Sequence, residues 1–338
     1  MLKPVVYWFV YPHLDMDKIR FGIIGCGDIA RKAFIPALKK SKYAEIVAVA
    51  SRNSNKAESV SVEFECDFES NYELLLNRND ISAIYIATVP STHEKIILAA
   101  AKNGKHILCE KPLTVSYNSA KKVVNYCKKM RIGILEGFMY QFHTQHQIVQ
   151  NIINVGEIGT PILMQAQFGF PPLKSDNFRY NKELGGGAIL DAGSYTLHIA
   201  RNIFKKEPVE VYSIIDYNKE GIDIHGTVLL NFHKGQTANL SFGFDNFYRN
   251  NYSVWGTEGY ISVMRSFSIS ETFKPRIILE KQDYYEEIEC NPENQFVSEI
   301  EYFCKNLNSE NIVNSWRNDA LSQAKLIAII KNQNKNKK

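Results

Sequence analysis

A strand that breaks into a glycine turn constrains this chain more than any other feature. Residues 21–30 read F-G-I-I-G-C-G-D-I-A, and a helix-like run follows. Gly25 permits the tight turn, Gly27 lets a phosphate approach bare backbone, and Ala30 is small enough for close packing of helix on strand. The helix start adds free N–H groups and a positive dipole end. We therefore expect a dinucleotide to contact Gly25, Cys26, Gly27, Asp28, Ile29 and Ala30, although a turn without a ligand would use the same residues.

The next strand pattern favours one dinucleotide over another. Residues 45–50 (E-I-V-A-V-A) form an apolar run that ends at Ser51-Arg52. An NAD site usually carries Asp or Glu at this point to hold the ribose 2′-hydroxyl. Arginine suits a 2′-phosphate instead, because its planar fork matches phosphate oxygens, and Ser51 adds a hydroxyl. The sequence therefore favours NADP(H) over NAD(H), with a solvated surface arginine as the alternative.

Strand and helix patterns alternate through the first third of the chain. Such alternation indicates a parallel sheet with helices on both faces, so we expect an α/β Rossmann domain at residues 18–137. The expected strands are Ile19–Ile24, Ile46–Ala50, Ile81–Thr88, Lys105–Leu108 and Ile132–Leu135. The expected helices are Ile29–Lys39, Asn53–Phe64, Tyr72–Asn77, Thr92–Asn103 and Tyr117–Met130.

After about residue 160 strand-like runs follow one another, separated by short turns such as His233-Lys234-Gly235. This pattern predicts an α+β domain at residues 138–330 with a large, mostly antiparallel open sheet. The expected strands are Ile162–Phe170, Glu210–Asp216, Gly226–Phe232, Thr237–Phe244, Asn251–Gly256 and Arg276–Lys281. The expected helices are Ala192–Phe204, Asn294–Asn306 and Asp319–Lys331.

The two ends of the chain look unlike its body. Residues 331–338 hold four lysines and no acid, so we expect a disordered basic tail. Without it the formal charge of +4 falls to zero, which argues against a nucleic-acid partner. Residues 1–17 are expected to be an extension, with Met16 as the natural start. Their apolar stretch, Val5–Val10, is too short to cross a membrane.

The cysteine pattern bears on the compartment. The chain has six cysteines and no C-x-x-C pair. Cys26 and Cys109 fall in turns where a disulfide would be awkward. We expect six reduced thiols in a cytoplasmic protein.

Two further clusters carry groups suited to catalysis. Glu110-Lys111-Pro112 follows a predicted strand end, where ligands sit in open α/β sheets. A glycine-rich run at residues 184–195 (L-G-G-G-A-I-L-D-A-G-S-Y) places Asp191 and Tyr195 four residues apart, on one face of the helix that follows. A carboxylate beside a phenol can hold a substrate hydroxyl and exchange a proton with it. A nearby lysine would lower the pKa of the phenol. A solvated turn and an ordinary helix start are the alternatives.

Taken together, these motifs resemble the Gfo/Idh/MocA family of nicotinamide-dependent oxidoreductases. The resemblance rests on the glycine turn, on E-K-P, on E-G-F-M-Y-Q-F-H (136–143), on G-E-I-G (156–159) and on the glycine-rich run, and spans roughly Ile19 to Phe296. It implies that Lys111 lies beside the nicotinamide, next to Glu110, and that Tyr195 is the proton donor. It also implies a cofactor groove lined by Thr88, Pro90 and His93, and a homodimer or homotetramer formed through the second sheet.

Within the family, the segments F-G-F-P-P (168–172) and D-N-F-R-Y (176–180) look most like sugar-nucleotide 3-ketoreductases. This branch implies NADPH-dependent reduction of a keto group on a nucleotide-linked sugar, with Tyr195 as acid, Lys111 assisting and Asp191 on a neighbouring hydroxyl. The expected substrate contacts are Arg179, Tyr180, Asp191, Tyr195, His198 and Arg249. Gln141 departs from the family pattern, because many relatives carry arginine there, and this puts the shape of the substrate pocket in doubt.

Other functions stay open at this point. A dehydrogenase of a free sugar or cyclitol shares most of these motifs, and a non-catalytic NADP-binding sensor needs only the glycine turn. His143 and His146 are three residues apart, yet no Cys or acid stands at useful spacing, so we expect no metal site.

Overall fold

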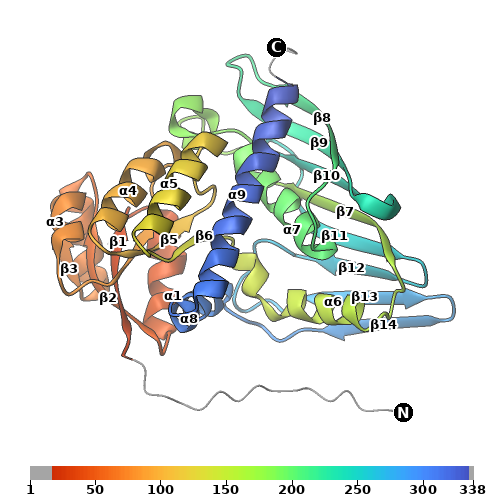
Figure 1. Cartoon of the computed structure of the whole chain (residues 1–338), viewed down its shortest axis with the longest axis horizontal. Coiled ribbons are helices and arrows are strands. Elements are labelled where there is room, and N and C mark those ends of the chain that lie inside the picture. The colour runs from red at the N-terminus through yellow and green to blue at the C-terminus, as the bar shows by residue number, and fades with distance from the viewer. Residues whose placement is uncertain (1–16, 335–338) are drawn as a thin grey trace.

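The computed structural model describes residues 17–334 (Figure 1). The expected extension therefore lies almost wholly outside the described residues, and so does the end of the tail, 335–338. Within the described range the chain forms two sheets, one in each half. None of its helices is long and apolar enough to span a membrane.

The first half is a six-stranded parallel sheet with the order β3-β2-β1-β4-β5-β6. Its central strands are buried on both faces, as continuous apolar runs predict for a covered parallel sheet. The strands are β1 (Ile19–Ile24), β2 (Ala44–Ala50), β3 (Asp67–Glu69), β4 (Ala83–Ile86), β5 (His106–Glu110) and β6 (Ile134–Gly137). The helices are α1 (Ile35–Lys40), α2 (Ser54–Phe64), α3 (Tyr72–Asn77), α4 (His93–Lys102) and α5 (Tyr117–Lys129).

Asparagine and serine side chains fix where three of these helices begin. The side chains of Asn53, Asn71 and Ser116 accept hydrogen bonds from backbone N–H groups in the first turns of α2, α3 and α5. These bonds satisfy donors that the helix itself leaves free. The helix after the glycine turn departs from the expectation, because it opens with a π-helical turn, η1 (Ala30–Phe34), before α1.

The second half is an eight-stranded sheet with the order β14-β13-β12-β11-β7-β10-β9-β8. All its pairs are antiparallel except β10 with β7, which is parallel. Its strands are β7 (Pro161–Gly169), β8 (Glu210–Tyr217), β9 (Asp223–Asn231), β10 (Thr237–Gly243), β11 (Arg249–Gly256), β12 (Tyr260–Met264), β13 (Arg276–Lys281) and β14 (Tyr284–Glu289).

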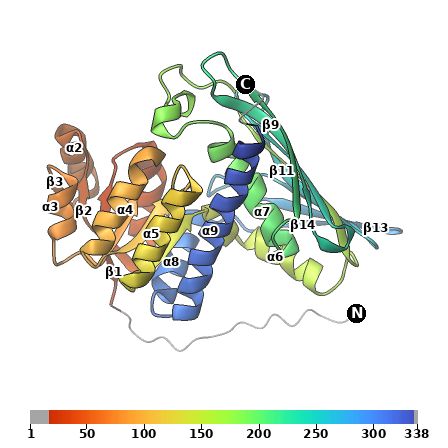
Figure 2. The same cartoon turned by 45° about the horizontal axis from the view of Figure 1, so that its top comes forward.

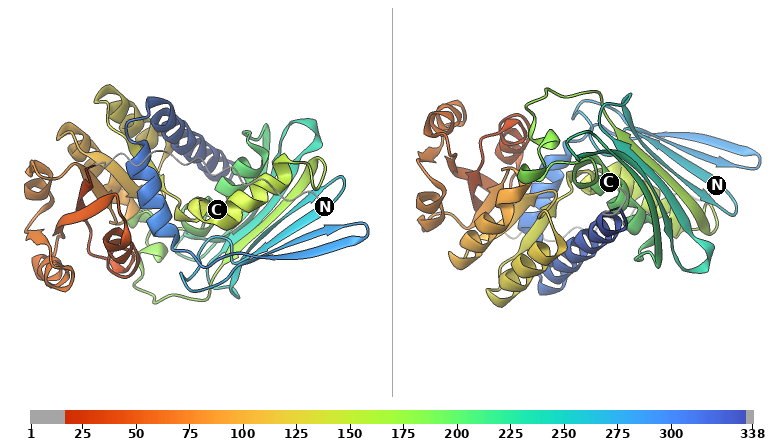
Figure 3. Two further views of the ribbon diagram at one scale, coloured as in Figure 1. Left: turned by 90° about the horizontal axis from the view of Figure 1, so that it is seen from below. Right: turned by 90° about the horizontal axis from the view of Figure 1, so that it is seen from above.

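Helices cover only one face of the second sheet. These are α6 (Thr144–Asn154) and α7 (Ser194–Phe204), preceded by the 3₁₀-helix η3 (Met139–Phe142) and the π-helical turn η6 (Ile189–Gly193) respectively. Figures 2 and 3 show the sheet as a curved layer whose other face carries no helix of the described chain. That outer face exposes large apolar side chains, among them Ile214 and Trp255.

The two last helices join the halves. Helix α8 (Gln295–Asn306) packs on α1 and η3, while α9 (Glu310–Gln333) contacts α5 and β6 on one side and α7 and β8 on the other. We expected both helices to belong to the second domain, and the structure shows them in contact with both halves. The expected disordered tail is also wrong at its start. Helix α9 continues to Gln333, and the buried Asn334 donates to the Ser213 hydroxyl at 2.8 Å.

Most other expected elements are confirmed within a few residues, and α3, β1 and β13 match in full. The sequence reading missed β3, α6, β12 and β14. The turn at 233–235 between β9 and β10 is present, as expected. All six cysteines are free thiols.

Candidate active site

A cavity of about 900 Å³ lies between the carboxyl ends of the first sheet and the near end of the second. It opens where β1 and β4 stand side by side, the point at which the strand order reverses and dinucleotides bind in such sheets. Both halves of the chain line this cavity, hereafter the cleft. Most of the expected cofactor contacts lie in it: Gly25, Cys26, Gly27, Asp28, Ile29, Ser51, Arg52, Thr88, Pro90, Glu110 and Lys111.

The glycine turn has the shape that a pyrophosphate needs. Gly25 has a φ of +104°, and a Cβ there would lie 2.5 Å from the Ala87 carbonyl oxygen, so no other residue fits without a shift. At Gly27 the nearest atom to such a Cβ is 3.9 Å away, which leaves the backbone open to the cleft. Ala30 is fully buried against β1 and does not reach the cleft. The cradle therefore fits a dinucleotide, with Ala30 serving the packing.

Two cations lie at the end of the cleft near β2. Arg52 and Lys56 both line it, and neither forms an ion pair with a carboxylate of the described chain. The Tyr72 side chain, which also lines the cleft, hydrogen-bonds to Arg52. The Ser51 hydroxyl accepts from the Asn53 backbone N–H at 3.3 Å. This is a site with two uncommitted positive charges, and the sequence reading found only one of them.

The three expected catalytic groups converge in the cleft from both halves. Asp191, from η6, forms ion pairs with the Lys111 ammonium and with the Arg179 guanidinium. The Lys111 Nζ lies 4.7 Å from the centre of the Tyr195 ring. Burial alone would raise the pKa of Asp191, but Lys111 and Arg179 hold it well below its ordinary value. Asp191 is therefore a carboxylate with two bound cations.

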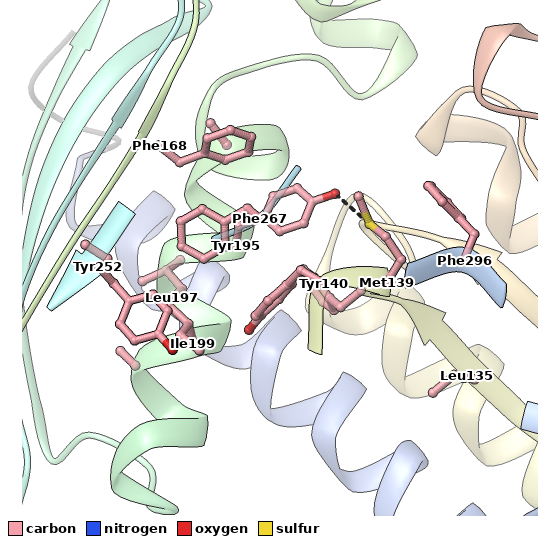
Figure 4. Close-up of a cluster of buried hydrophobic side chains, with 14 of the residues drawn as sticks. Leu135, Met139, Tyr140, Phe168, Tyr195, Leu197, Ile199, Tyr252, Phe267 and Phe296 are labelled. Carbon is pink, nitrogen blue, oxygen red and sulfur yellow. Dashed lines mark hydrogen bonds between the residues drawn. The ribbon is translucent and has the colours of Figure 1, made fainter. Parts of the chain in front are cut away.

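The expected pKa shift of the Tyr195 hydroxyl is wrong. We expected Lys111 to lower its pKa, but burial, together with the charges of Glu110 and Asp191, raises that pKa well above the ordinary value. The lysine lies over the ring face, and the hydroxyl donates instead to the Met139 sulfur at 3.4 Å (Figure 4). In this state Tyr195 is firmly protonated.

Two acids, the half-buried Glu110 and the buried Glu136, support the strand end that carries Lys111. A Glu110 carboxyl oxygen accepts from the Tyr85 hydroxyl at 2.6 Å. The Lys111–Pro112 peptide bond is cis, and the next N–H, of Leu113, donates to Glu136 at 2.7 Å. Burial raises the pKa of Glu136 to about 8. Glu136 belongs to the E-G-F-M-Y-Q-F-H motif, yet the sequence reading gave it no role.

Two expected histidine contacts are wrong. His93 is fully buried behind the cleft, and its ring nitrogens contact the carbonyl oxygens of Pro112 at 3.0 Å and Thr88 at 3.1 Å. His198 is also fully buried, about one turn after Tyr195 on α7, where it bonds to Tyr140 at 2.6 Å and to Asp319 at 2.9 Å. Neither lines the cleft. A sequence shows the residue type but not which face of its helix is buried.

Two of the expected substrate contacts also lie outside the cleft lining. The Tyr180 hydroxyl donates to Asp245 and accepts from the Leu173 N–H, so it ties the loop after β7 to the loop after β10. Arg249 is exposed on β11 and donates to Gln167 at 3.0 Å. Its chain neighbour Tyr248 lines the cleft in its place.

Several lining residues were not expected from the sequence. Together their side chains give the cleft both apolar and polar surface, which suits a second ligand beside the cofactor. They are Lys32, Met139, Phe168, Phe170, Leu173, Asn177, Phe178, Tyr248 and Ser268. The segments F-G-F-P-P and D-N-F-R-Y, already noted, were the available signal for four of them.

His143 and His146 form hydrogen bonds within the protein core. The His143 side chain accepts from the Gln145 N–H at 3.1 Å, and His146 bonds to Tyr252 at 3.1 Å and to the Ser266 carbonyl at 2.9 Å. Across residues 17–334 there is no group of three His, Cys, Asp or Glu side chains placed to hold a metal ion.

Comparison with known proteins supports this description of the chain. Residues 19–137 match the model of an oxidoreductase family with an NAD-binding Rossmann fold, and residues 146–262 match a GFO/IDH/MocA C-terminal domain. A dTDP-3,4-didehydro-2,6-dideoxy-alpha-D-glucose 3-reductase of Saccharopolyspora spinosa is 34% identical over 86% of this chain and 87% of its own. The chain belongs to the Gfo/Idh/MocA family of oxidoreductases. Its expected fold class is thereby confirmed.

Two further members show how wide the similarity is. The 3-ketoreductase KijD10 of Actinomadura kijaniata, solved with NADP and TDP-benzene, has a TM-score of 0.89 at 31% identity. That alignment covers 94% of this chain and 98% of KijD10. A D-xylose 1-dehydrogenase (NADP(+)) of Haloferax volcanii is 30% identical over 84% of this chain and 88% of its own.

Proposed function

We propose that this protein reduces a keto group on a nucleotide-linked sugar with NADPH. The observation that carries the proposal is the meeting of Lys111, Asp191 and Tyr195 from the two halves, beside a cradle shaped for a dinucleotide. The named relatives in the 3-reductase class support the substrate class and point to the ketone at sugar carbon 3.

The residues at one end of the cleft fit NADP(H). The turn at Gly25 and Gly27 would receive the pyrophosphate. Arg52 and Lys56 would hold the 2′-phosphate, since both are cations without a carboxylate partner in the described chain. When bound, the cofactor supplies the hydride. The rest of the chemistry belongs to side chains of the protein.

Tyr195 is the proposed acid. Its raised pKa keeps the phenol protonated at neutral pH, so the proton is in place for the substrate oxygen when hydride reaches the ketone carbon. The phenol has to leave the Met139 sulfur to reach that oxygen, and a sulfur acceptor is weak enough to release it.

Lys111 and Asp191 would position the substrate. A sugar hydroxyl entering between them can accept from the ammonium and donate to the carboxylate, replacing part of their direct ion pair. Arg179 remains on the other Asp191 oxygen and stacks over Phe178, with its Cζ 4.8 Å from the ring centre. From there it is the proposed contact for the substrate diphosphate, next to Tyr248 and Ser268.

The test is a matched pair of assays with purified protein. NADPH oxidation with a dTDP-linked 3-keto sugar is expected to exceed, by at least about 100-fold in kcat/KM, the reduction of NADP+ by free aldoses or cyclitols. The similarity to a xylose dehydrogenase makes the free-sugar reaction the second candidate. Faster turnover of free sugar would select it. No turnover of either class, with NADPH still bound, would favour a cofactor-binding sensor.

We further propose that two chains pair through the outer face of the second sheet. Tyr212 and Leu229 lie opposite each other on β8 and β9 there, and Ile214 is 77% exposed. Contiguous exposed apolar surface of this kind marks an interaction site. Sedimentation of wild type should show a dimer or tetramer, and the double variant I214K/W255K should sediment as a monomer.

A further inference from the structure

Glu299, in the middle of α8, is a buried acid to which the proposed reaction assigns no role. Its exposed fraction is 0%, and neither carboxyl oxygen has a hydrogen-bond partner in the described chain. An ionised carboxylate in that position would be a buried charge without compensation, which folded proteins avoid by protonation. Glu299 is therefore held as a neutral acid with a proton to donate.

Helix α8 packs on the element that carries Met139, which lines the cleft, although Glu299 itself does not line it. The helix packs on η3 and η1, and Figure 4 shows Phe296 next to Met139, the residue that holds the Tyr195 hydroxyl. Glu299 follows Phe296 by three residues, so both point from the same side of the helix. The acid thus lies on the face of α8 that is turned toward the reacting groups.

The titratable groups that face Glu299 come from three other elements. They are Tyr85 on β4, Glu110 at the end of β5, and Tyr195 on α7, each of which interacts electrostatically with it. Burial and the Glu110 charge both raise the pKa of Glu299, and no lysine or arginine of the described chain offsets them. Glu110 uses only one oxygen for the Tyr85 hydroxyl. Its other oxygen is free to accept.

We propose that Glu110 and Glu299 share one proton below the cleft and return it to Tyr195 after each reduction. The inference rests on the proposed function. The Tyr195 O–H bond breaks as its proton passes to the ketone oxygen and hydride reaches the ketone carbon. The phenolate then takes the shared proton through a bridging water, and the carboxyl pair regains a proton from solvent through the cleft. NADPH is the only reductant required.

Two energetic arguments favour transfer of the proton from the carboxyl pair to the Tyr195 phenolate. A phenolate as basic as that of the buried Tyr195 draws a proton from either carboxyl group. The loss of that proton leaves two carboxylates close together, which is unfavourable on its own. An oxidised nicotinamide, when bound in the cleft, would carry a positive charge that offsets part of this second negative charge.

The first experiment reads the proton directly, on the full chain without ligands. Infrared spectroscopy at pH 7 should show the carbonyl stretch of a protonated buried carboxylic acid, shifted in deuterium oxide. Glu136, whose pKa is about 8, contributes to the same band, so the comparison uses a Glu136→Gln background. In that background the band should vanish with Glu299→Gln and persist with Glu301→Gln. Glu301 is the matched control, since it lies on the same helix but pairs with Lys305 at the surface. A Glu136→Gln spectrum without the band would overturn the shared proton.

The second experiment reads the return of the proton. Glu299→Gln should lower kcat about tenfold, raise the solvent isotope effect and leave KM for NADPH within twofold, whereas Glu301→Gln should match wild type. Should Glu299→Gln fold poorly, Glu110→Gln tests the same pair from the cleft side. Unchanged kcat and isotope effect in a folded variant would overturn the proposal. Wild type that shows the band but reduces no keto-sugar would contradict the proposed function itself, and the proton's return with it.

Discussion

The Lys111 ammonium lies over the face of the Tyr195 ring, 4.7 Å from its centre, and not beside its hydroxyl. In that place it is attracted by the π-electrons while its charge is neutralised by Asp191. The lysine therefore does little to ionise the phenol in the unliganded protein. Its catalytic use begins when a substrate hydroxyl separates it from Asp191.

Replacing Tyr195 by Phe should reduce kcat about 100-fold, because the acid is lost while hydride transfer remains possible. The aromatic ring would keep its edge-to-face contacts with Phe138 and Phe168, so folding stability should change by less than about 1 kcal/mol. Steady-state kinetics and NADPH titration by fluorescence measure this. Unaltered kcat would remove Tyr195 as the acid.

Replacing Lys111 by Ala should cost more than the tyrosine variant, about 1,000-fold in kcat/KM, since the residue contacts both cofactor and substrate sites. Asp191 would keep Arg179 as its partner, so the protein should still fold. The surface variant Lys122→Ala, which breaks only an exposed pair with Glu94, serves as control. A loss confined to KM would mean that the lysine only binds.

Replacing Arg52 or Lys56 by Ala should raise KM for NADPH about tenfold each, because each removes one charge-assisted bond to the 2′-phosphate. KM for NADH should change less than twofold, since NADH lacks that phosphate. The exposed Lys95→Ala is the control. Equal losses with both cofactors would show that these cations hold another part of the ligand.

Glu136 should make the protein less stable as the pH rises. Its pKa is about 8 in the folded chain against an ordinary value of 4.5, so the folded state binds the extra proton between those limits. Its contribution to stability is then complete below pH 4.5 and is lost as the pH rises through 8. Glu136→Gln keeps an oxygen for the Leu113 N–H and should flatten the fall in Tm between pH 6 and pH 9.

Glu301→Gln, at a half-buried position where the carboxylate pairs with Lys305, provides the comparison for that titration. Its fall in Tm over the same pH range should follow wild type. A Glu136→Gln curve parallel to wild type would show that the carboxyl is already ionised at pH 6.

The turns that carry the candidate functional residues could be predicted because their conformation depends on local sequence. Gly25 and Lys111 occupy strand ends in any α/β sheet of this kind, and the residues about them encode the turns. The missed elements carry weak patterns. Strand β14, Y-Y-E-E-I-E, lies at a sheet edge with both faces largely exposed, so no apolar alternation marks it. Helix α6 is rich in glutamine and asparagine.

The errors in the site have a different cause. His93 and His198 were assigned from the family resemblance and the Tyr195 hydroxyl from residue type, whereas their behaviour depends on burial and on which neighbour takes up a charge. Lys111 would have lowered the Tyr195 pKa had Asp191 not taken its charge, and that pairing joins residues from opposite halves. Lys56 was missed because nothing in a helix sequence tells which lysine turns toward a cleft.

Helix α9 contacts α5 and β6 with one side and α7 and β8 with the other, so it is a shared wall of both halves. An engineer who wished to graft the sugar-recognising half of a relative onto this nucleotide-binding half could not cut once near residue 138. The donor segment would have to stop before α8, and the returning helices would have to match two surfaces. Recombination between members of such a family is thus restricted to insertions flanked by native sequence on both sides.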